Sequence, residues 1–160
     1  MTTGNKSEYI TAIVVDDDID TLDVFCEYLE LYQFRIVGKA YSGEKVADLY
    51  SKFKPDVVFL DVMMDNYDGI YALAEIRKVN PDAVVIMVTA DLTQETDEKL
   101  RQLHATSVIY KPFDIKNVMR IVKSVVHFPE NITHDIPQSE LMVPVTIPVF
   151  HSQYKWGIKK

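Results

Sequence analysis

The sequence predicts a doubly wound α/β fold, in which one parallel β-sheet lies between two layers of helices. Short apolar runs rich in Val and Ile recur along the chain, and segments with helical periodicity separate them. Runs of this kind are typical of parallel strands that are covered on both faces. The two signals alternate from Thr11 to Phe128, which predicts five strands and five helices in three layers.

The elements follow one another at short spacing. The expected strands are the apolar runs at residues 12–15, 35–40, 57–60, 84–88 and 108–110. The first helix begins after a capping residue, Asp18, and ends near Tyr32. The second helix is opened by residues 42–44 and stopped by Pro55, and we expect Phe53 to face the core.

The second half of the chain supplies three more helices. One carries Ile70, Leu73, Ala74 and Ile76 and is stopped at Asn80. The next, residues 93–103, is mostly charged, with Leu92, Leu100 and Leu103 as its expected apolar contacts, so it should be held less tightly than its neighbours. The last helix follows residues 111–114 and turns Ile115, Val118, Met119 and Val122 toward the core.

The pattern changes after Phe128, so we divide the chain into a tail at residues 1–8, a domain at 9–128 and an extension at 129–160. Apolar residues alternate within 142–150, but Pro144 and Pro148 interrupt the run. Proline limits such a segment to an edge strand or an extended arm. This arm either packs on its own domain or is donated to a partner, for instance in a dimer.

Composition excludes several classes of protein. The net charge of -7 argues against nonspecific binding of nucleic acid, because no basic stripe is present. Cys26 is the single cysteine, which excludes an intrachain disulfide and suits a reducing compartment. The sequence shows neither a signal peptide nor an apolar run of the ~20 residues that a bilayer requires, so we expect a cytoplasmic protein without membrane contact.

Polar residues stand directly after four of the expected strands. They are Asp16 and Asp17, Asp61, Thr89 and Lys111. The carboxyl ends of parallel strands meet at one edge of the sheet, where open α/β sheets keep their sites. Three carboxylates, one hydroxyl and one ammonium group are therefore expected in a single pocket.

These groups predict phosphoryl chemistry. Crowded carboxylates without Cys or His suit Mg²⁺, with Mn²⁺ as the other choice. Mg²⁺ commonly binds phosphate oxygens as well, which leaves one carboxylate to attack phosphorus. Asp61 is the best nucleophile because it stands on the central strand. Lys111 would pair with one phosphoryl oxygen, and Thr89 would donate a hydrogen bond to another.

The motifs together resemble the receiver domain of two-component response regulators. They are Ile13-Val14-Val15-Asp16-Asp17-Asp18, Phe59-Leu60-Asp61-Val62-Met63-Met64, Asp68-Gly69, Val88-Thr89-Ala90 and Tyr110-Lys111-Pro112-Phe113. The resemblance implies the flavodoxin-like doubly wound fold, with a histidine kinase that passes its phosphoryl group to Asp61. It also implies that Asp16, Asp17 and Asp61 hold Mg²⁺ together with the backbone carbonyl of Met63.

Four positions depart from the pattern of this family. Asp65 stands where Pro is common, and His104 stands where Gly is common. The family usually has an aromatic switch residue at the position of Val108, whereas here Tyr110 directly precedes Lys111. The resemblance therefore implies that the usual coupling between Thr89 and an aromatic ring is absent or follows another route.

The sequence thus predicts a single-domain response regulator that signals through protein contacts and is not an enzyme, apart from its own phosphoryl transfer and slow dephosphorylation. Its expected partners are a histidine kinase or phosphotransfer protein and a downstream target protein. A homodimer could form through the extension or through the face of the fourth helix, fifth strand and fifth helix. The alternative is a phosphorylation-independent adaptor or dimeric scaffold, and an Mg²⁺-dependent phosphohydrolase is a weaker one.

Overall fold

The apolar runs form a single parallel sheet whose three central strands are almost entirely buried. The computed structural model describes residues 9–128 and the strand at 146–147, and the strand order is β2-β1-β3-β4-β5. The strands are β1 (Ile10–Val15), β2 (Phe34–Ala40), β3 (Val57–Asp61), β4 (Val85–Thr89) and β5 (Ser107–Tyr110). All four neighbouring pairs in this sheet are parallel. The predicted flavodoxin-like fold is confirmed.

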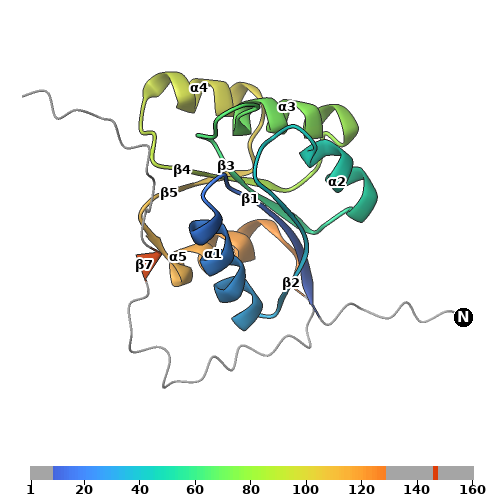
Figure 1. Ribbon diagram of the computed structural model, residues 1–160, viewed down its shortest axis with the longest axis vertical. Helices are drawn as coiled ribbons and strands as arrows, with labels where there is room; N and C mark the ends of the chain where they lie inside the picture. The colour runs from blue at the N-terminus through green and yellow to red at the C-terminus, as the bar shows by residue number, and fades with distance from the viewer. Residues whose placement is uncertain (1–8, 129–145, 148–160) are drawn as a thin grey trace, which may run out of the picture.

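Helices cover both faces of the sheet (Figure 1). One face carries α1 (Ile19–Leu31) and α5 (Ile115–Val125), and the other carries α2 (Val46–Phe53), α3 (Gly69–Val79) and α4 (Gln94–Gln102). Within the described part of the chain, no helix is both long enough and apolar enough to cross a membrane.

Successive residues of the strands serve two separate cores. In β1, Ala12 and Val14 pack in the core under α1 and α5, while Ile13 and Val15 pack in the core under α2, α3 and α4. Side chains alternate between the two faces of a strand, so a strand that is covered on both faces must be apolar throughout. Cys26 lies buried in the first core, as its position on an apolar helix face predicts.

Side-chain caps begin four of the five helices. The carboxylate of Asp18 accepts a hydrogen bond from the Thr21 N–H at 2.8 Å, as predicted. Asp68, Thr93 and Asp114 cap α3, α4 and α5 in the same way. Such a cap stabilises a helix by about 0.5–2 kcal/mol, because it satisfies a backbone donor that has no partner inside the helix.

Two predicted apolar contacts are wrong. Phe53 is 39% exposed, because it is the last residue of α2 and only its edge reaches the sheet, near Gly38. Leu92 is 76% exposed, because it precedes the helix cap Thr93, so the helical period does not apply to it. The contacts of α4 with the core rest mainly on Leu100, which is 2% exposed. The light anchoring of α4 agrees with the prediction.

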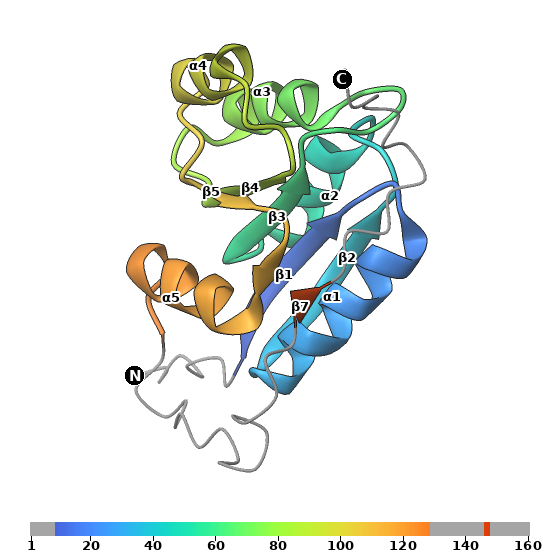
Figure 2. The same ribbon diagram turned by 90° about the vertical axis from the view of Figure 1, so that its left-hand side faces the viewer.

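A second, very small sheet lies beside α1 (Figure 2). It consists of β6 (Phe113–Asp114) and β7 (Thr146–Ile147), which pair antiparallel. The predicted tail at residues 1–8 and the remainder of the extension lie outside the described residues.

Candidate functional site

Asp61 is the last residue of β3, the central strand of the sheet. Its side chain is 2% exposed. Neighbouring strands end at the same level, because Val15 pairs with Leu60 in the register of β1 and β3, and Val88 pairs with Asp61 in the register of β3 and β4. The residues that follow β1 and close β4 therefore stand on either side of Asp61, as the sequence predicts.

Lys111 joins two of the predicted acidic residues. It directly follows β5, and its Nζ donates to Asp16 Oδ2 at 2.9 Å and to Asp61 Oδ1 at 3.3 Å. Only 3% of the Lys111 side chain is exposed. Burial lowers the pKa of Lys111, but the neighbouring charges of Asp61 and Asp16 more than offset this effect, so the pKa lies above its ordinary value. The ammonium group therefore stays charged at neutral pH.

Three carboxylates gather at the end of β1 and β3. One oxygen each of Asp16, Asp17 and Asp61 lies within 4.8 Å of the others. Burial, followed by the charge of Asp61, raises the pKa of Asp16, while the contacts with Lys111 and the Asp18 N–H oppose that rise. Three carboxylate oxygens this close together repel one another, so the cluster favours a bound cation.

The donor set fits a hard divalent cation. Three carboxylates offer oxygen ligands and no sulfur or imidazole, which is the chemistry that Mg²⁺ prefers. Asp17 also accepts a hydrogen bond from the Asp65 N–H at 3.2 Å, so the loop after β3 lies against the cluster. The structure thus places an acidic cluster typical of Mg²⁺ binding at the predicted position. Met63 lies in that loop with 40% of its surface exposed.

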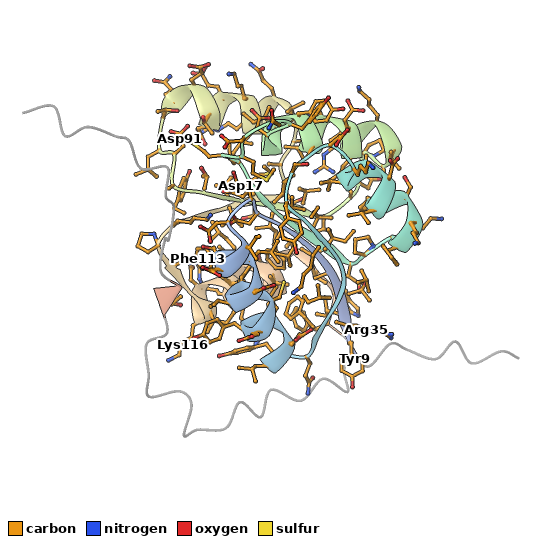
Figure 3. All side chains as sticks on the ribbon, in the orientation of Figure 1. Tyr9, Asp17, Arg35, Asp91, Phe113 and Lys116 are labelled. Atoms are coloured by element: carbon orange, nitrogen blue, oxygen red, sulfur yellow. The ribbon has the colours of Figure 1, made fainter. Side chains whose placement is uncertain are left out.

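The remaining predicted side chain, Thr89, ends β4 and is 1% exposed. Its Oγ1 accepts a hydrogen bond from the Asp91 N–H at 2.9 Å. This contact uses a lone pair of the hydroxyl oxygen and leaves the hydroxyl hydrogen for an acceptor. Figure 3 shows Asp17 and Asp91 at the same edge of the sheet, whereas Tyr9 and Arg35 lie at the opposite edge.

Asp91 links the site to α4, a role that the sequence did not reveal. Its carboxylate accepts from the Thr93 N–H at 2.8 Å and from the Thr96 hydroxyl at 2.5 Å. Burial raises the pKa of Asp91, but these hydrogen bonds outweigh burial and hold the pKa below its ordinary value. An Asp two residues before a Thr that caps a helix was the available signal.

Gly69 packs directly against the backbone of Asp61. A Cβ at Gly69 would lie 2.1 Å from the carbonyl oxygen of Asp61, well inside contact distance. Glycine is therefore required where the first turn of α3 crosses the end of β3. The pair Asp68-Gly69 is one of the motifs that resemble receiver domains, but the sequence alone does not show why glycine is needed at position 69.

A cavity of about 370 Å³ adjoins Thr89. Val108, Leu100 and Tyr110 are among the residues that line it. Val108 is half-buried and Tyr110 is 45% exposed. The position at which the family usually has an aromatic residue therefore carries a small side chain on the wall of a cavity beside Thr89.

Comparisons with known proteins agree with the motifs and with the fold. The family model described as response regulator receiver domain matches residues 12–123. Protein CcdB of Bacillus subtilis is 38% identical over 117 residues, which cover 72% of this chain and 98% of that protein. Chemotaxis protein CheY of Halobacterium salinarum is 32% identical over 71% of this chain and 93% of that protein.

A solved structure with a similar fold is CheY of Borrelia burgdorferi, in a crystal structure of the CheX-CheY-BeF3-Mg²⁺ complex. The match has a TM-score of 0.69 and 29% identity, and it covers 72% of this chain and 88% of the other. Motifs, fold, family model and relatives agree. This chain belongs to the response regulator receiver domain family and is a CheY-like signalling domain of two-component systems.

Proposed function

We propose that this protein accepts a phosphoryl group onto Asp61 from a phosphohistidine of a histidine kinase or phosphotransfer protein. A carboxylate oxygen of Asp61 forms a bond to phosphorus as the bond between phosphorus and the imidazole nitrogen breaks. The donor histidine keeps the electron pair of the broken bond and takes up a proton. The product on this chain is an acyl phosphate.

The observation that carries the proposal is the contact of Lys111 Nζ with both Asp16 and Asp61 at the buried end of the central strand. The ammonium group can remain beside Asp61 and pair with a phosphoryl oxygen, which compensates the charge that arrives with the phosphoryl group. The hydroxyl of Thr89 donates to a second phosphoryl oxygen.

We assign a Mg²⁺ site to Asp16, Asp17, Asp61 and the backbone carbonyl of Met63. A bound Mg²⁺ would neutralise charge on the phosphoryl oxygens. The complex of CheY from Borrelia burgdorferi with BeF3 and Mg²⁺ supports this assignment, and its CheX partner supports signalling through protein contacts. The predicted cytoplasmic location, dimer contacts and slow self-dephosphorylation stay predictions.

Incubation with acetyl phosphate and Mg²⁺ tests the proposal, with intact mass as the readout. We expect a gain of about 80 Da, the mass of one phosphoryl group. Asp61→Asn should abolish the gain. Asp82→Asn, which removes an exposed carboxylate from the loop before β4, should keep it. A gain that persists in Asp61→Asn would contradict the assignment of Asp61.

One observation favours a second candidate function. Val108 and the cavity beside Thr89 remove the aromatic route between the site and the α4 face that the family resemblance implies. A receiver without that route could serve as a phosphorylation-independent adaptor. Target binding with equal affinity by phosphorylated and unphosphorylated protein would support this candidate.

A further inference from the structure

The small sheet formed by β6 and β7 joins two distant parts of the chain. Phe113 pairs with Ile147 and Asp114 pairs with Thr146, in antiparallel register. Both views place β7 next to α1 (Figures 1 and 2). A segment of the extension therefore lies against its own domain, across α1 and the start of α5. We call residues 146–147 the clasp.

The sequence around the clasp suits a short added strand. Pro144 and Pro148 stand on either side of it. A residue before proline is held in extended conformations, which applies to Ile147, and proline itself has no N–H for a ladder. The two prolines therefore favour an extended segment but limit how far the pairing can continue.

The docking surface of the clasp is connected to the acidic site by the backbone. Phe113 comes two residues after Lys111, whose Nζ contacts Asp16 and Asp61. A displacement of the Lys111 backbone therefore reaches β6 through a single intervening residue. The clasp pairs with β6 in the state in which Lys111 is bound to both carboxylates.

Aromatic contacts fix β6 from the side of the core. The ring of Phe113 packs edge-on against Phe25 of α1, with centroids 5.4 Å apart. Phe25 in turn packs edge-on against Phe59 of β3 at 5.1 Å. Phe59 precedes Asp61 by two residues. The surface that receives the clasp is thus part of the packing that supports Asp61 and Lys111.

We propose that β6 and the adjoining face of α1 are a docking surface for the chain's own clasp, and that docking of the clasp opposes modification of Asp61. The proposal rests on the proposed function of Asp61. A phosphoryl group on Asp61 draws the Lys111 ammonium group away from Asp16, which shifts the backbone that carries β6 and weakens its pairing with the clasp. By linkage, release of the clasp favours phosphorylation by the same factor.

Proline substitutions in the clasp test this coupling in the full chain. Successive N–H groups of a strand point alternately toward and away from the partner strand, so only one of Thr146 and Ile147 donates to β6. We would make Thr146→Pro and Ile147→Pro separately, because at least one of them must break the pairing. Gln138→Pro is the matched control, since it places the same residue in the extension outside the paired positions.

Two readouts separate docking from coupling. Hydrogen exchange of peptides that contain residues 113–114 and 146–147 reports docking in the unphosphorylated protein. Intact mass after acetyl phosphate and Mg²⁺ reports the rate and extent of phosphorylation. In at least one proline variant we expect faster exchange of both peptides, and a ratio of phosphorylated to unphosphorylated protein that is higher by about fivefold or more, the lower end of usual coupling factors. Gln138→Pro should match the unsubstituted protein.

The effect of phosphorylation on docking of the clasp has its own control. Phosphorylation of the unsubstituted protein should speed exchange of residues 146–147, and Asp61→Asn under the same conditions should show no change. Both effects should be independent of protein concentration, because the clasp docks on its own domain. Dependence on concentration would mean that a second copy supplies the strand, and would overturn the intramolecular proposal.

The remaining outcomes are distinguishable. Unchanged exchange in both proline variants would show that the clasp does not dock, and faster exchange with unchanged phosphorylation would show docking without coupling. Either result overturns the inference while the proposed function stands. If neither the unsubstituted protein nor any clasp variant gains mass, the proposed function itself fails, and the coupling fails with it.

Discussion

At the scale of single residues, the position of Asp61 depends on a glycine that has no functional group. The carbonyl oxygen of Asp61 occupies the space that a Cβ at Gly69 would take. The first turn of α3 can therefore approach β3 closely enough for the loop between them to fold over the acidic cluster. A larger side chain at position 69 would therefore displace the backbone that carries Asp61.

We expect Gly69→Ala to lower the free energy of unfolding by about 1–3 kcal/mol, the usual cost of overpacking. The added methyl group meets backbone atoms, which cannot turn aside as a side chain does. Urea denaturation measures the loss. Gly38→Ala is the control, because its Cβ would first meet the side chain of Ile13 at 3.2 Å. A smaller loss in Gly69→Ala than in Gly38→Ala would contradict the prediction.

At the scale of elements, a single arginine ties three segments together. The guanidinium group of Arg77, in the last turn of α3, donates to the carbonyl oxygens of Ala83 at 2.7 Å, Leu103 at 3.2 Å and His104 at 2.6 Å. It thereby holds the start of β4 and the connection from α4 to β5 against α3. Because α4 has few apolar contacts of its own, this arginine contributes much of its attachment.

We expect Arg77→Met to lower the free energy of unfolding by about 1.5–3 kcal/mol, the range for hydrogen bonds to a charged group. Methionine keeps much of the apolar stem and removes all three donors. Arg101→Met is the control, because Arg101 pairs with Asp97 on the exposed face of α4 and is 78% exposed. Surface ion pairs of this kind contribute little. Equal losses in the two variants would refute the role of Arg77.

The attachment of α4 should also depend on pH through Asp91. The pKa of Asp91 is lower in the folded protein than its ordinary value of 3.8, because hydrogen bonds from Thr96 and Thr93 outweigh burial. Its contribution to stability is therefore fully present above pH 3.8 and is lost as the pH falls through the folded pKa.

The measurement is the difference in unfolding free energy between the unsubstituted protein and Asp91→Asn. We expect this difference to favour the unsubstituted protein at pH 7 and to shrink as the pH falls below 3.8. Comparison of the two proteins at each pH cancels the titration of all other carboxylates. A difference that stays constant from pH 7 to pH 3 would show that the charge of Asp91 does not hold α4.

At the scale of the whole molecule, we expect a bound cation to stabilise the fold through the acidic cluster. Three carboxylates crowd together at the end of the sheet, so bound Mg²⁺ should stabilise the folded chain by mass action. We expect about 2.7 kcal/mol when Mg²⁺ is present at 100 times its Kd. For a chain of this size the melting temperature should rise by about 2–4 °C per kcal/mol.

Thermal unfolding with Mg²⁺ and with a chelator measures this effect. Asp17→Asn should lose most of the response to Mg²⁺, and it should be at least as stable as the unsubstituted protein in the chelator, since it relieves repulsion in the cluster. An equal response to Mg²⁺ in the two proteins would place the metal elsewhere.

The sequence predicted the sheet, its five helices and the convergence of Asp16, Asp17, Asp61 and Lys111, because these depend on apolar periodicity and on where strands end. It also placed Thr89 at the end of the neighbouring strand. It failed at Phe53 and Leu92, which stand at a helix end and outside a helix, where periodicity carries no information about burial. It also missed the hydrogen bonds that Asp91 accepts from Thr93 and Thr96 at the start of α4, although an Asp two residues before a capping Thr was an available signal.

Two further features could not be predicted from the sequence, because they depend on backbone geometry. His104 adopts φ 53°, a left-handed conformation that glycine adopts more easily, which explains why glycine is common there in the family. The pairing of β6 with β7 involves two residues on each side, too few to produce a period in the sequence. The roles of the predicted site residues in phosphoryl transfer stay predictions until the mass measurement is made.

The ion pairs of Lys111 span 95 residues to Asp16 and 50 residues to Asp61. While the chain is being made, Asp16 and Asp61 both leave the ribosome before Lys111 does. Until Lys111 emerges and β5 joins the sheet, the nascent chain carries an acidic cluster without its ammonium group. We therefore expect a chain that stops short of residue 111, which lacks the ammonium group of the proposed site, to gain no phosphoryl group from a phosphodonor.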